Sequence, residues 1–383
     1  MKFSGAAHIG DIVEYGFPRG HLGHLSSDEE EALSTFKELC IENGLYDPIS
    51  AGGEFCHRDD ALLLRFLRAR RFNVPDAFKQ FQDTEQWRNA NEIDKLYNTI
   101  DLERYDETRR LYPQWTGRRD RRGLPVYVFE VKHLNSKTMS AYEKSVGATA
   151  HASSKTPQKL LGLFALYENL TRFVMPLCTV ATDRKYPGTP ITQSMNIVDI
   201  SGVSLTMFWN LRSHMQDASV LATAHYPETL GCIFIIGAPS FFSTVWGWIK
   251  RWFDPITTSK IFILSHHDMK ATLELFIDPA NIPKKYGGEL DFEFGQTPVL
   301  DPGLKDALQW EGSYKDFPPG PIYWKDKDDH IEAIAVGSVG SKERDEIICT
   351  VRKVDYDSRL ANESARLTET TTPPKMSTSA LKN

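Results

Sequence analysis

Residues 230–264 read LGCIFIIGAPSFFSTVWGWIKRWFDPITTSKIFIL. Two short apolar runs, 232–238 and 260–264, enclose a segment that is rich in aromatic residues. Continuous apolar runs of this length are typical of strands that are buried on both faces. Gly237, Pro239 and Ser240 interrupt the run, so no piece approaches the ~20 apolar residues that cross a bilayer. We therefore predict a strand, a helix and a second strand here, and no membrane span.

Two further apolar runs lie upstream, LPVYVFEV at 124–131 and SMNIVDI at 194–200. Amphipathic segments of helical length separate most of the runs. In a parallel sheet, crossover helices connect the strands and cover both faces. The alternation therefore predicts an α/β domain that is built on a mainly parallel sheet.

The residues before this domain have the pattern of a small helical module. SSDEE at 26–30 supplies a capping serine and the acidic residues of a first helical turn. Helical segments follow in DDALLLRFLRARRF and in VPDAFKQFQDTEQW. We expect an N-terminal extension at 1–25, the helical module at 26–100 and the α/β domain at 101–310.

The chain after Trp310 changes in composition. FPPGPIYWKDKDDH at 317–330 is rich in proline and charge, and the last residues read TETTTPPKMSTSALKN. Such compositions are typical of mobile termini. We predict a partly flexible extension at 311–383, in which the alternating run 346–354 forms an edge strand.

The composition excludes some functions. The 383 residues include 45 Lys plus Arg and 51 Asp plus Glu, which gives a net charge of −6. This charge supplies no global basic field that would hold nucleic acid. Five scattered cysteines form no CxxC pair, and the first 20 residues lack the apolar core of a secretory signal. We expect a cytoplasmic protein that binds no nucleic acid and has no disulfide framework.

Many α/β folds carry the catalytic motifs of enzymes. The sequence has no GxGxxG after a strand, no GxxxxGK[ST], no HExxH and no GxSxG. His266, His267 and Asp268 precede a helical segment, where a capping Asp is a simpler interpretation than a metal or catalytic site. We expect no enzyme activity, metal or cofactor, although a triad of distant residues stays open.

The aromatic segment 241–253 has almost no polar face if it is helical. Its apolar positions are Phe242, Val245, Trp246, Ile249, Trp252 and Phe253. One interpretation is a helix buried between the sheet and its neighbours. The other is a gate helix that covers a hydrophobic cavity and can face a membrane, where Trp and Phe favour the interfacial zone.

A basic cluster lies in TGRRDRRGLP at 116–125, around a turn at Asp120 and Gly123. We interpret it as an exposed turn, with binding to an anionic surface as the alternative.

Several of these stretches together resemble one known family. They are LLLRFLRARRFNVPDAF at 62–78 with EQWR at 85–88, YPQWTGRRDRRGLPVYVFE at 112–130, NIVDISGVS at 196–204, the stretch from His225 to Leu264, and IPKKYGGEL at 282–290. In this order they resemble the CRAL-TRIO family, and most of all its fungal phosphatidylinositol/phosphatidylcholine transfer proteins. The resemblance covers about residues 26–290. It implies a lipid pocket floored by the sheet and closed by a gate helix at 241–253.

The resemblance also implies a site for the phosphatidylinositol head group. The matching residues are Arg70, Arg71, Glu228, Thr257 and Lys260. Their chemistry suits this ligand, because Arg and Lys pair with a phosphodiester while Thr and Glu bond ring hydroxyls.

A second head-group site matches the family less well. The matching positions are Ser194, Asn196, Tyr127, Tyr167 and Trp115. The family has Thr at position 196, and a tyrosine pair where this chain has Trp115 and Thr116. The second ligand therefore stays open among phosphatidylcholine, another phospholipid, a sterol and a different hydrophobic molecule.

The resemblance implies a carrier that exchanges phosphatidylinositol and a second lipid between membranes and supports phosphoinositide signalling. Its partners would be these lipids, a transient membrane surface such as that of the Golgi or endosomes, and a lipid kinase. Two alternatives stay open: a non-exchanging sensor that presents its ligand to a lipid kinase, and a lipid-acting α/β hydrolase.

Overall fold

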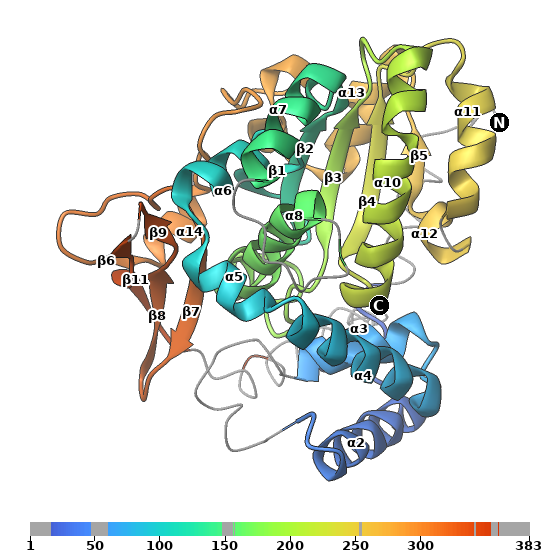
Figure 1. Cartoon of the computed structure of the whole chain (residues 1–383). Coiled ribbons are helices and arrows are strands. Elements are labelled where there is room, and N and C mark those ends of the chain that lie inside the picture. The colour runs from blue at the N-terminus through green and yellow to red at the C-terminus, as the bar shows by residue number, and fades with distance from the viewer. Residues whose placement is uncertain are drawn as a thin grey trace, which may run out of the picture.

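The computed structural model describes residues 17–46, 60–147, 156, 158–252, 255–340, 342–353 and 359 (Figure 1). Its N-terminal part is the predicted helical module, formed by α2 (Ser27–Glu42), α3 (Asp60–Ala69) and α4 (Val74–Ala90). Ser26 caps α2 and exchanges hydrogen bonds with Glu29 in a capping box. The rings of Phe36 and Phe66 both pack on Phe81 in a core of their own.

The central sheet has five strands in the order β1-β2-β3-β4-β5. These are β1 (Gln114–Arg119), β2 (Pro125–Glu130), β3 (Ser194–Asp199), β4 (Leu230–Ile236) and β5 (Ile261–Ile263). Strands β2 to β5 are parallel, which confirms the predicted α/β class and the four predicted strands. Strand β1 pairs antiparallel with β2, and its sequence QWTGRR has no apolar run from which to predict it.

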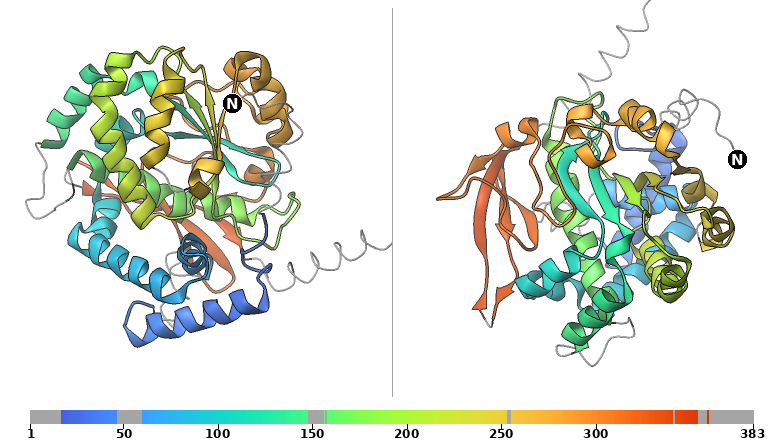
Figure 2. Two further views of the ribbon diagram at one scale, coloured as in Figure 1. Left: turned by 90° about the vertical axis from the view of Figure 1, so that its right-hand side faces the viewer. Right: turned by 90° about the horizontal axis from the view of Figure 1, so that it is seen from above.

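The two faces of the sheet are covered by different helices (Figure 2). Apolar side chains on one face, such as Val128, Ile197 and Phe234, pack with α13 (His266–Phe276) and with the segment around Tyr286. The other face meets α8 (Gln158–Asn169), its π-helical continuation Leu170–Val174, α9 (Met175–Val180), α10 (Leu205–His225) and α11 (Phe242–Ile249). The remaining helices are α5 (Ile93–Thr99), α6 (Leu102–Arg109), α7 (Ser136–Gly147), α12 (Pro255–Ser259), α14 (Pro302–Asp306), and the 3-10 turns Val131–His133, Lys250–Trp252, Pro279–Asn281 and Lys284–Tyr286.

A second sheet follows the α/β domain, in the order β6-β11-β8-β7. Its strands are β6 (Gln309–Trp310), β7 (Ile322–Asp326), β8 (His330–Ala335) and β11 (Glu346–Arg352), and a separate hairpin is made by β9 (Ser338–Val339) and β10 (Lys342–Glu343). Strand β11 pairs with both β6 and β8, so the prediction of an edge strand at 346–354 is wrong. Alternation along a strand reports which face is buried and not how many neighbours the strand has.

The second sheet shares a hydrophobic core with the α/β domain. Trp324 of β7 is fully buried, and its Nε1 donates a hydrogen bond to the Phe173 carbonyl at 3.0 Å. The sequence did not predict this strand, because prolines and charged residues flank the short apolar run around Trp324. Strand β6 lies before the expected boundary at residue 310 and pairs with a strand beyond it.

The basic turn at 116–125 is only partly exposed. Arg119 is buried and bonds both Asp183, at 2.7 Å, and Asp301, at 2.8 Å. Arg122 is also buried, and its guanidinium Nη2 donates to Asp120 Oδ2 at 2.9 Å. The exposed-turn interpretation is therefore wrong for these two residues. The acidic partners of Arg119, Asp183 and Asp301, are 64 and 182 residues away in the sequence, so local charge did not predict that pairing.

The described cysteines and helices bear on the expectations about disulfides and membrane spans. Cys40, Cys178, Cys232 and Cys349 are buried free thiols, while Cys56 lies outside the described residues. Among the helices that the structure describes, none has the length and apolar character that crossing a bilayer requires.

Candidate functional site

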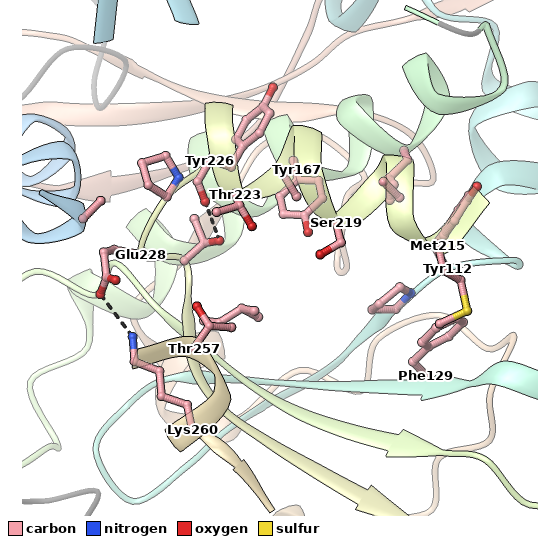
Figure 3. Close-up of a pocket in the computed structure, with 18 of the residues that line it drawn as sticks. Tyr112, Phe129, Tyr167, Met215, Ser219, Thr223, Tyr226, Glu228, Thr257 and Lys260 are labelled. Carbon is pink, nitrogen blue, oxygen red and sulfur yellow. Dashed lines mark hydrogen bonds and ion pairs between the residues drawn. The ribbon is translucent and has the colours of Figure 1, made fainter. Parts of the chain in front are cut away.

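A cavity of about 380 Å³ lies between α10 and the central sheet (Figure 3). Its walls come from the end of α3, from α4, α8, α10 and α12, and from the sheet. One end is polar and charged and includes Glu228, Thr257 and Lys260. The opposite end is largely apolar and includes Phe129, Leu134 and Met215. The cavity therefore matches an amphiphile that has one polar end.

All five residues predicted for the first head group line the charged end. They are Arg70, Arg71, Glu228, Thr257 and Lys260. The two arginines follow α3 and are exposed, which makes them accessible at the mouth of the cavity. Lys260 Nζ donates to Glu228 Oε2 at 3.1 Å, deeper in the same end. The fold thus joins three segments that are up to 190 residues apart.

The backbone at this end is unusual for residues with a side chain. Arg71 has φ 52° and Glu228 has φ 55°, both in the left-handed region. Such conformations persist only where surrounding contacts hold them. Around Glu228, Thr229 Oγ1 donates to the Tyr226 carbonyl at 3.0 Å, and Ser194 N donates to the Thr229 carbonyl at 2.9 Å. These bonds hold the loop that directs Glu228 toward Lys260.

Arg68 lies next to the charged end, and the resemblance did not indicate it. Its Nε lies 3.9 Å from Glu228 Oε2, and 9% of its side chain is exposed. Burial lowers the pKa of Arg68 to about 10, Glu228 partly offsets this effect, and the neighbouring Arg65 adds to it. Glu228 therefore lies between two cations, Lys260 and Arg68. The signal was present in the sequence, because Arg68 belongs to the same basic helix end as Arg70.

The second predicted set is largely not brought to the cavity. Only Tyr167 lines it. Trp115, Tyr127 and Asn196 are cross-strand neighbours on β1, β2 and β3, and all three are buried. Asn196 Nδ2 donates to the buried Ser194 Oγ at 3.0 Å. Trp115 and Tyr127 instead belong to the core shared with the second sheet.

The helix α11 occupies the place predicted for the gate. Phe242, Val245 and Ile249 are buried in a cluster with residues of the sheet, such as Ile235 and Ile261. A second cavity of about 40 Å³ lies between this helix and α10.

Helix α11 also carries two tryptophans, of which Trp246 packs against this cluster. Trp246 is half-buried, and Trp248 is 41% exposed. The ring of Trp248 lies 5.4 Å from that of Trp209 on α10. The side chain of Trp252 and the whole of Phe253 lie outside the described residues. Gly237, before the helix, has φ 67°, and a Cβ there would overlap the Ser201 hydroxyl, so only glycine fits this bend.

A buried charged network supports the cavity wall behind Tyr167 and Tyr226. Glu168 is fully buried and accepts hydrogen bonds from Arg88 Nη1 and from the Tyr226 hydroxyl, both at 2.6 Å. Burial and the negative charge of Glu168 raise the pKa of Tyr226 well above its usual range, so its hydroxyl stays protonated. Burial also raises the pKa of Tyr167 to about 12. The EQWR motif thus contributes Arg88 to the support of this wall.

The helical module also holds the end of α10. Gln80 Nε2 donates to the carbonyls of Thr223, at 3.2 Å, and Ala224, at 2.9 Å. The ring of His225 stacks on Trp87 with centroids 4.2 Å apart. Burial lowers the pKa of His225 to about 4. These contacts fix the last turn of α10 and the loop that carries Glu228.

The prediction of a capping Asp at 266–268 is wrong in its residue. The cap of α13 is Ser265, whose Oγ accepts from Asp268 N at 3.2 Å and donates to Asp268 Oδ2 at 2.7 Å. Asp268 therefore partners the cap and is not itself the cap. Within the described ranges, no group of three or more His, Cys, Asp or Glu side chains is arranged to hold a metal ion.

Comparison with known families gives two matches. The family model described as "CRAL/TRIO domain" matches residues 109–288. The model described as "CRAL/TRIO, N-terminal domain" matches residues 24–83. These ranges contain all five residues at the charged end of the cavity.

Three relatives illustrate the similarity. The chain is 32% identical to "SEC14 cytosolic factor" of Yarrowia lipolytica over 74% of this chain and 52% of that protein. It is 31% identical to "Sec14 cytosolic factor" of Schizosaccharomyces pombe over 76% of this chain and 93% of that protein. It is 30% identical to "Phosphatidylinositol/phosphatidylcholine transfer protein SFH7" of Arabidopsis thaliana over 69% of this chain and 44% of that protein. The aligned part thus spans about half of the Yarrowia and Arabidopsis relatives.

Proposed function

The chain belongs to the CRAL/TRIO family, and from this premise we propose that it transfers phosphatidylinositol and a second lipid between membranes. The observation that carries the proposal is that Arg70, Arg71, Glu228, Thr257 and Lys260 line one end of a single cavity. The name of the Arabidopsis relative, a phosphatidylinositol/phosphatidylcholine transfer protein, supports the same function. We propose a carrier and not an enzyme.

Head-group recognition follows from the charges at this end. The lipid phosphodiester binds the cations Arg70, Arg71 and Lys260. The inositol hydroxyls donate to Glu228 and exchange a hydrogen bond with Thr257. Hydrogen bonds to charged groups are stronger than neutral ones, so this set distinguishes inositol from head groups without hydroxyls.

The apolar end holds the acyl chains. A diacyl lipid has ~30 methylenes, and at ~0.8 kcal/mol each their exposure to water costs on the order of 25 kcal/mol. A carrier must therefore enclose the chains during transport. The half-buried and buried apolar side chains of α8, α10 and the sheet provide this enclosure.

We further propose that α11 is the gate. Its inner face covers the sheet, and its outer face presents Trp248. Contact with a membrane would exchange the packing of Phe242, Val245 and Ile249 for contact with lipid, which opens the interior. Trp252 and Phe253 extend the same apolar surface in the sequence.

The second lipid is phosphatidylcholine or another hydrophobic ligand. The relative's name favours phosphatidylcholine. In this chain, however, Ser194, Asn196, Tyr127 and Trp115 are buried in mutual contacts, and of the five predicted residues only Tyr167 lines the cavity. A second head group would bind near Tyr167.

The carrier would work in the cytosol, visit membranes such as those of the Golgi or endosomes, and supply a lipid kinase in phosphoinositide signalling. Two relatives are named cytosolic factors, which supports this location.

The deciding experiment has two parts. Mass spectrometry of lipid extracted from the purified protein should find phosphatidylinositol. The protein should then move labelled phosphatidylinositol between two populations of vesicles. Bound phosphatidylinositol without vesicle-to-vesicle movement would instead indicate a sensor, and released fatty acid or head group would indicate a hydrolase. Absence of any bound phospholipid would overturn the proposal.

A further inference from the structure

One wall of the cavity carries polar side chains among apolar ones, where acyl chains alone would need a fully apolar surface. Helix α10 contributes His214, Met215, Ala218, Ser219, Ala222 and Thr223 to the lining. Figure 3 shows Ser219 and Thr223 along the helix on the side that faces the sheet. The His214 ring already has a hydrogen-bond partner, because its Nε2 lies 2.7 Å from the Tyr112 hydroxyl. Ser219 lies between this pair and the charged end.

The hydroxyl of Ser219 has no hydrogen-bond partner among the residues that the structure describes, although its oxygen is buried. A serine inside a helix usually points to solvent or donates to the carbonyl four residues earlier, here that of Met215. Thr84 does this in α4, where its Oγ1 donates to the Gln80 carbonyl at 2.9 Å. Ser219 does neither, so it lacks the structural role that would explain a buried hydroxyl.

The position of Ser219 indicates which ligand group it meets. It lies six residues before His225, the last residue of α10, which corresponds to about 9 Å along the helix axis. The charged residue Glu228 follows three residues after this helix end. In a phospholipid the first polar groups beyond the phosphate are the two acyl ester carbonyls, and these only accept hydrogen bonds. A hydroxyl donor in the wall, one to two turns from the charged end, fits such a carbonyl.

We propose that Ser219 Oγ donates a hydrogen bond to an acyl ester carbonyl of bound phosphatidylinositol, so that the protein distinguishes diacyl from ether-linked lipid. This inference rests on the proposed function. It adds a contact with the glycerol region, between head group and acyl chains. Removal of the Ser219 hydroxyl should therefore weaken the binding of a lipid that has the ester carbonyl and leave the binding of an ether lipid unchanged.

The test combines one substitution with one change of ligand. Binding of diacyl and of dialkyl ether phosphatidylinositol is measured for the wild type, for Ser219→Ala and for the control Ser213→Ala, an exposed position of the same helix. A neutral hydrogen bond of ordinary strength corresponds to roughly a 2- to 10-fold change in affinity. We expect wild type and the control to bind the diacyl lipid 2- to 10-fold more tightly than the ether lipid. Ser219→Ala should bind both with the affinity that wild type has for the ether.

The outcomes separate this inference from the proposed function. If Ser219→Ala weakens both lipids equally, or if wild type does not prefer the ester, the carbonyl contact is wrong while phosphatidylinositol binding stands. If the loss appears only with diacyl phosphatidylcholine, the contact belongs to the second lipid and the assignment to phosphatidylinositol is wrong. If wild type binds neither form of phosphatidylinositol, the proposed function fails and the inference fails with it.

Discussion

Lys260 Nζ lies 3.1 Å from Glu228 Oε2, and the two residues precede the neighbouring parallel strands β5 and β4. The charged end of the cavity is therefore at the amino edge of the sheet. In most open α/β sheets, ligands bind outside the carboxyl ends of the strands. Here the helical module lies next to the amino edge and adds Arg68, Arg70 and Arg71, which gives that edge its positive charge.

The first prediction concerns Lys260. Lys260→Ala should reduce phosphatidylinositol transfer at least 10-fold, because the phosphate loses a cation and Glu228 loses its nearest partner. Transfer of the second lipid should stay within about 2-fold of wild type. The control is Lys325→Ala, at an exposed position on β7. Equal losses of both activities in a folded protein would contradict the head-group assignment.

The second prediction concerns the gate. Trp248→Glu should slow transfer between vesicles about 10-fold, because a carboxylate on the outer face of α11 opposes insertion among lipids. The free energy of unfolding should change by only ~0.5 kcal/mol, as for most exposed positions. Leu275→Glu is the matched control, since Leu275 is 45% exposed on α13. Wild-type transfer by Trp248→Glu would exclude a gate that works through this face.

The third prediction concerns the buried network behind the cavity. Glu168→Leu leaves the buried Arg88 without its main partner, and breaking such a pair costs roughly 3–5 kcal/mol of unfolding free energy. Chemical denaturation measures the loss. Lys95→Met removes an exposed pair with Glu92, 3.2 Å in length, and should cost about 0–1 kcal/mol. A loss below 1 kcal/mol for Glu168→Leu would mean that the network does not stabilise this wall.

The fourth prediction concerns pH. The pKa of His225 falls from its ordinary value of 6.5 to about 4 in the folded chain, mainly through burial, with Arg88 adding to the effect and Asp83 opposing it. Between these values the unfolded chain binds more protons than the folded chain, so stability falls as the pH falls from 6.5 toward 4. Thermal unfolding at pH 7 and pH 5 should show this loss.

A variant isolates the contribution of His225. His225→Phe keeps an aromatic ring against Trp87 and removes the titrating group, so it should lose less stability over this pH range than wild type. His21 is also buried with a lowered pKa, so part of the loss should remain. An identical pH dependence in wild type and His225→Phe would refute the assignment.

Much of the fold was predictable because a strand or helix that is buried between apolar neighbours has a local pattern of apolar residues in the sequence. The run 232–238 is apolar throughout, and apolar residues outnumber polar ones in 194–200, because helices cover both faces of their strands. Strand β1 was missed because Thr116 and Arg119 are buried through bonds to Val126 and Asp301, and such polar burial has no local pattern. The short strand around Trp324 was missed for a related reason, since its flanking residues are charged.

Some residues of the candidate site could likewise be predicted from the sequence, and others could not. The residues of the charged end were predictable from motifs, because Arg70, Glu228 and Lys260 each belong to a short linear stretch. The proximity of Arg68 to Glu228 and the burial of Trp115 were not. Each depends on a partner more than 50 residues away in the sequence.

The amino-acid sequence alone determined the order of the buried strands, the helical module and the motif residues. The strands and helices could be predicted because the period and length of an apolar run depend on which faces of the element are buried. Only the tertiary structure decided that Lys260 and Glu228 pair at the amino edge of the sheet. It also decided that Arg119 pairs with Asp183 and Asp301, and that no other described residue bonds the Ser219 hydroxyl beside the cavity. The physical reason is that hydrogen bonds and ion pairs depend on distances of about 3 Å between atoms, and only the folded chain brings residues that are distant in the sequence this close.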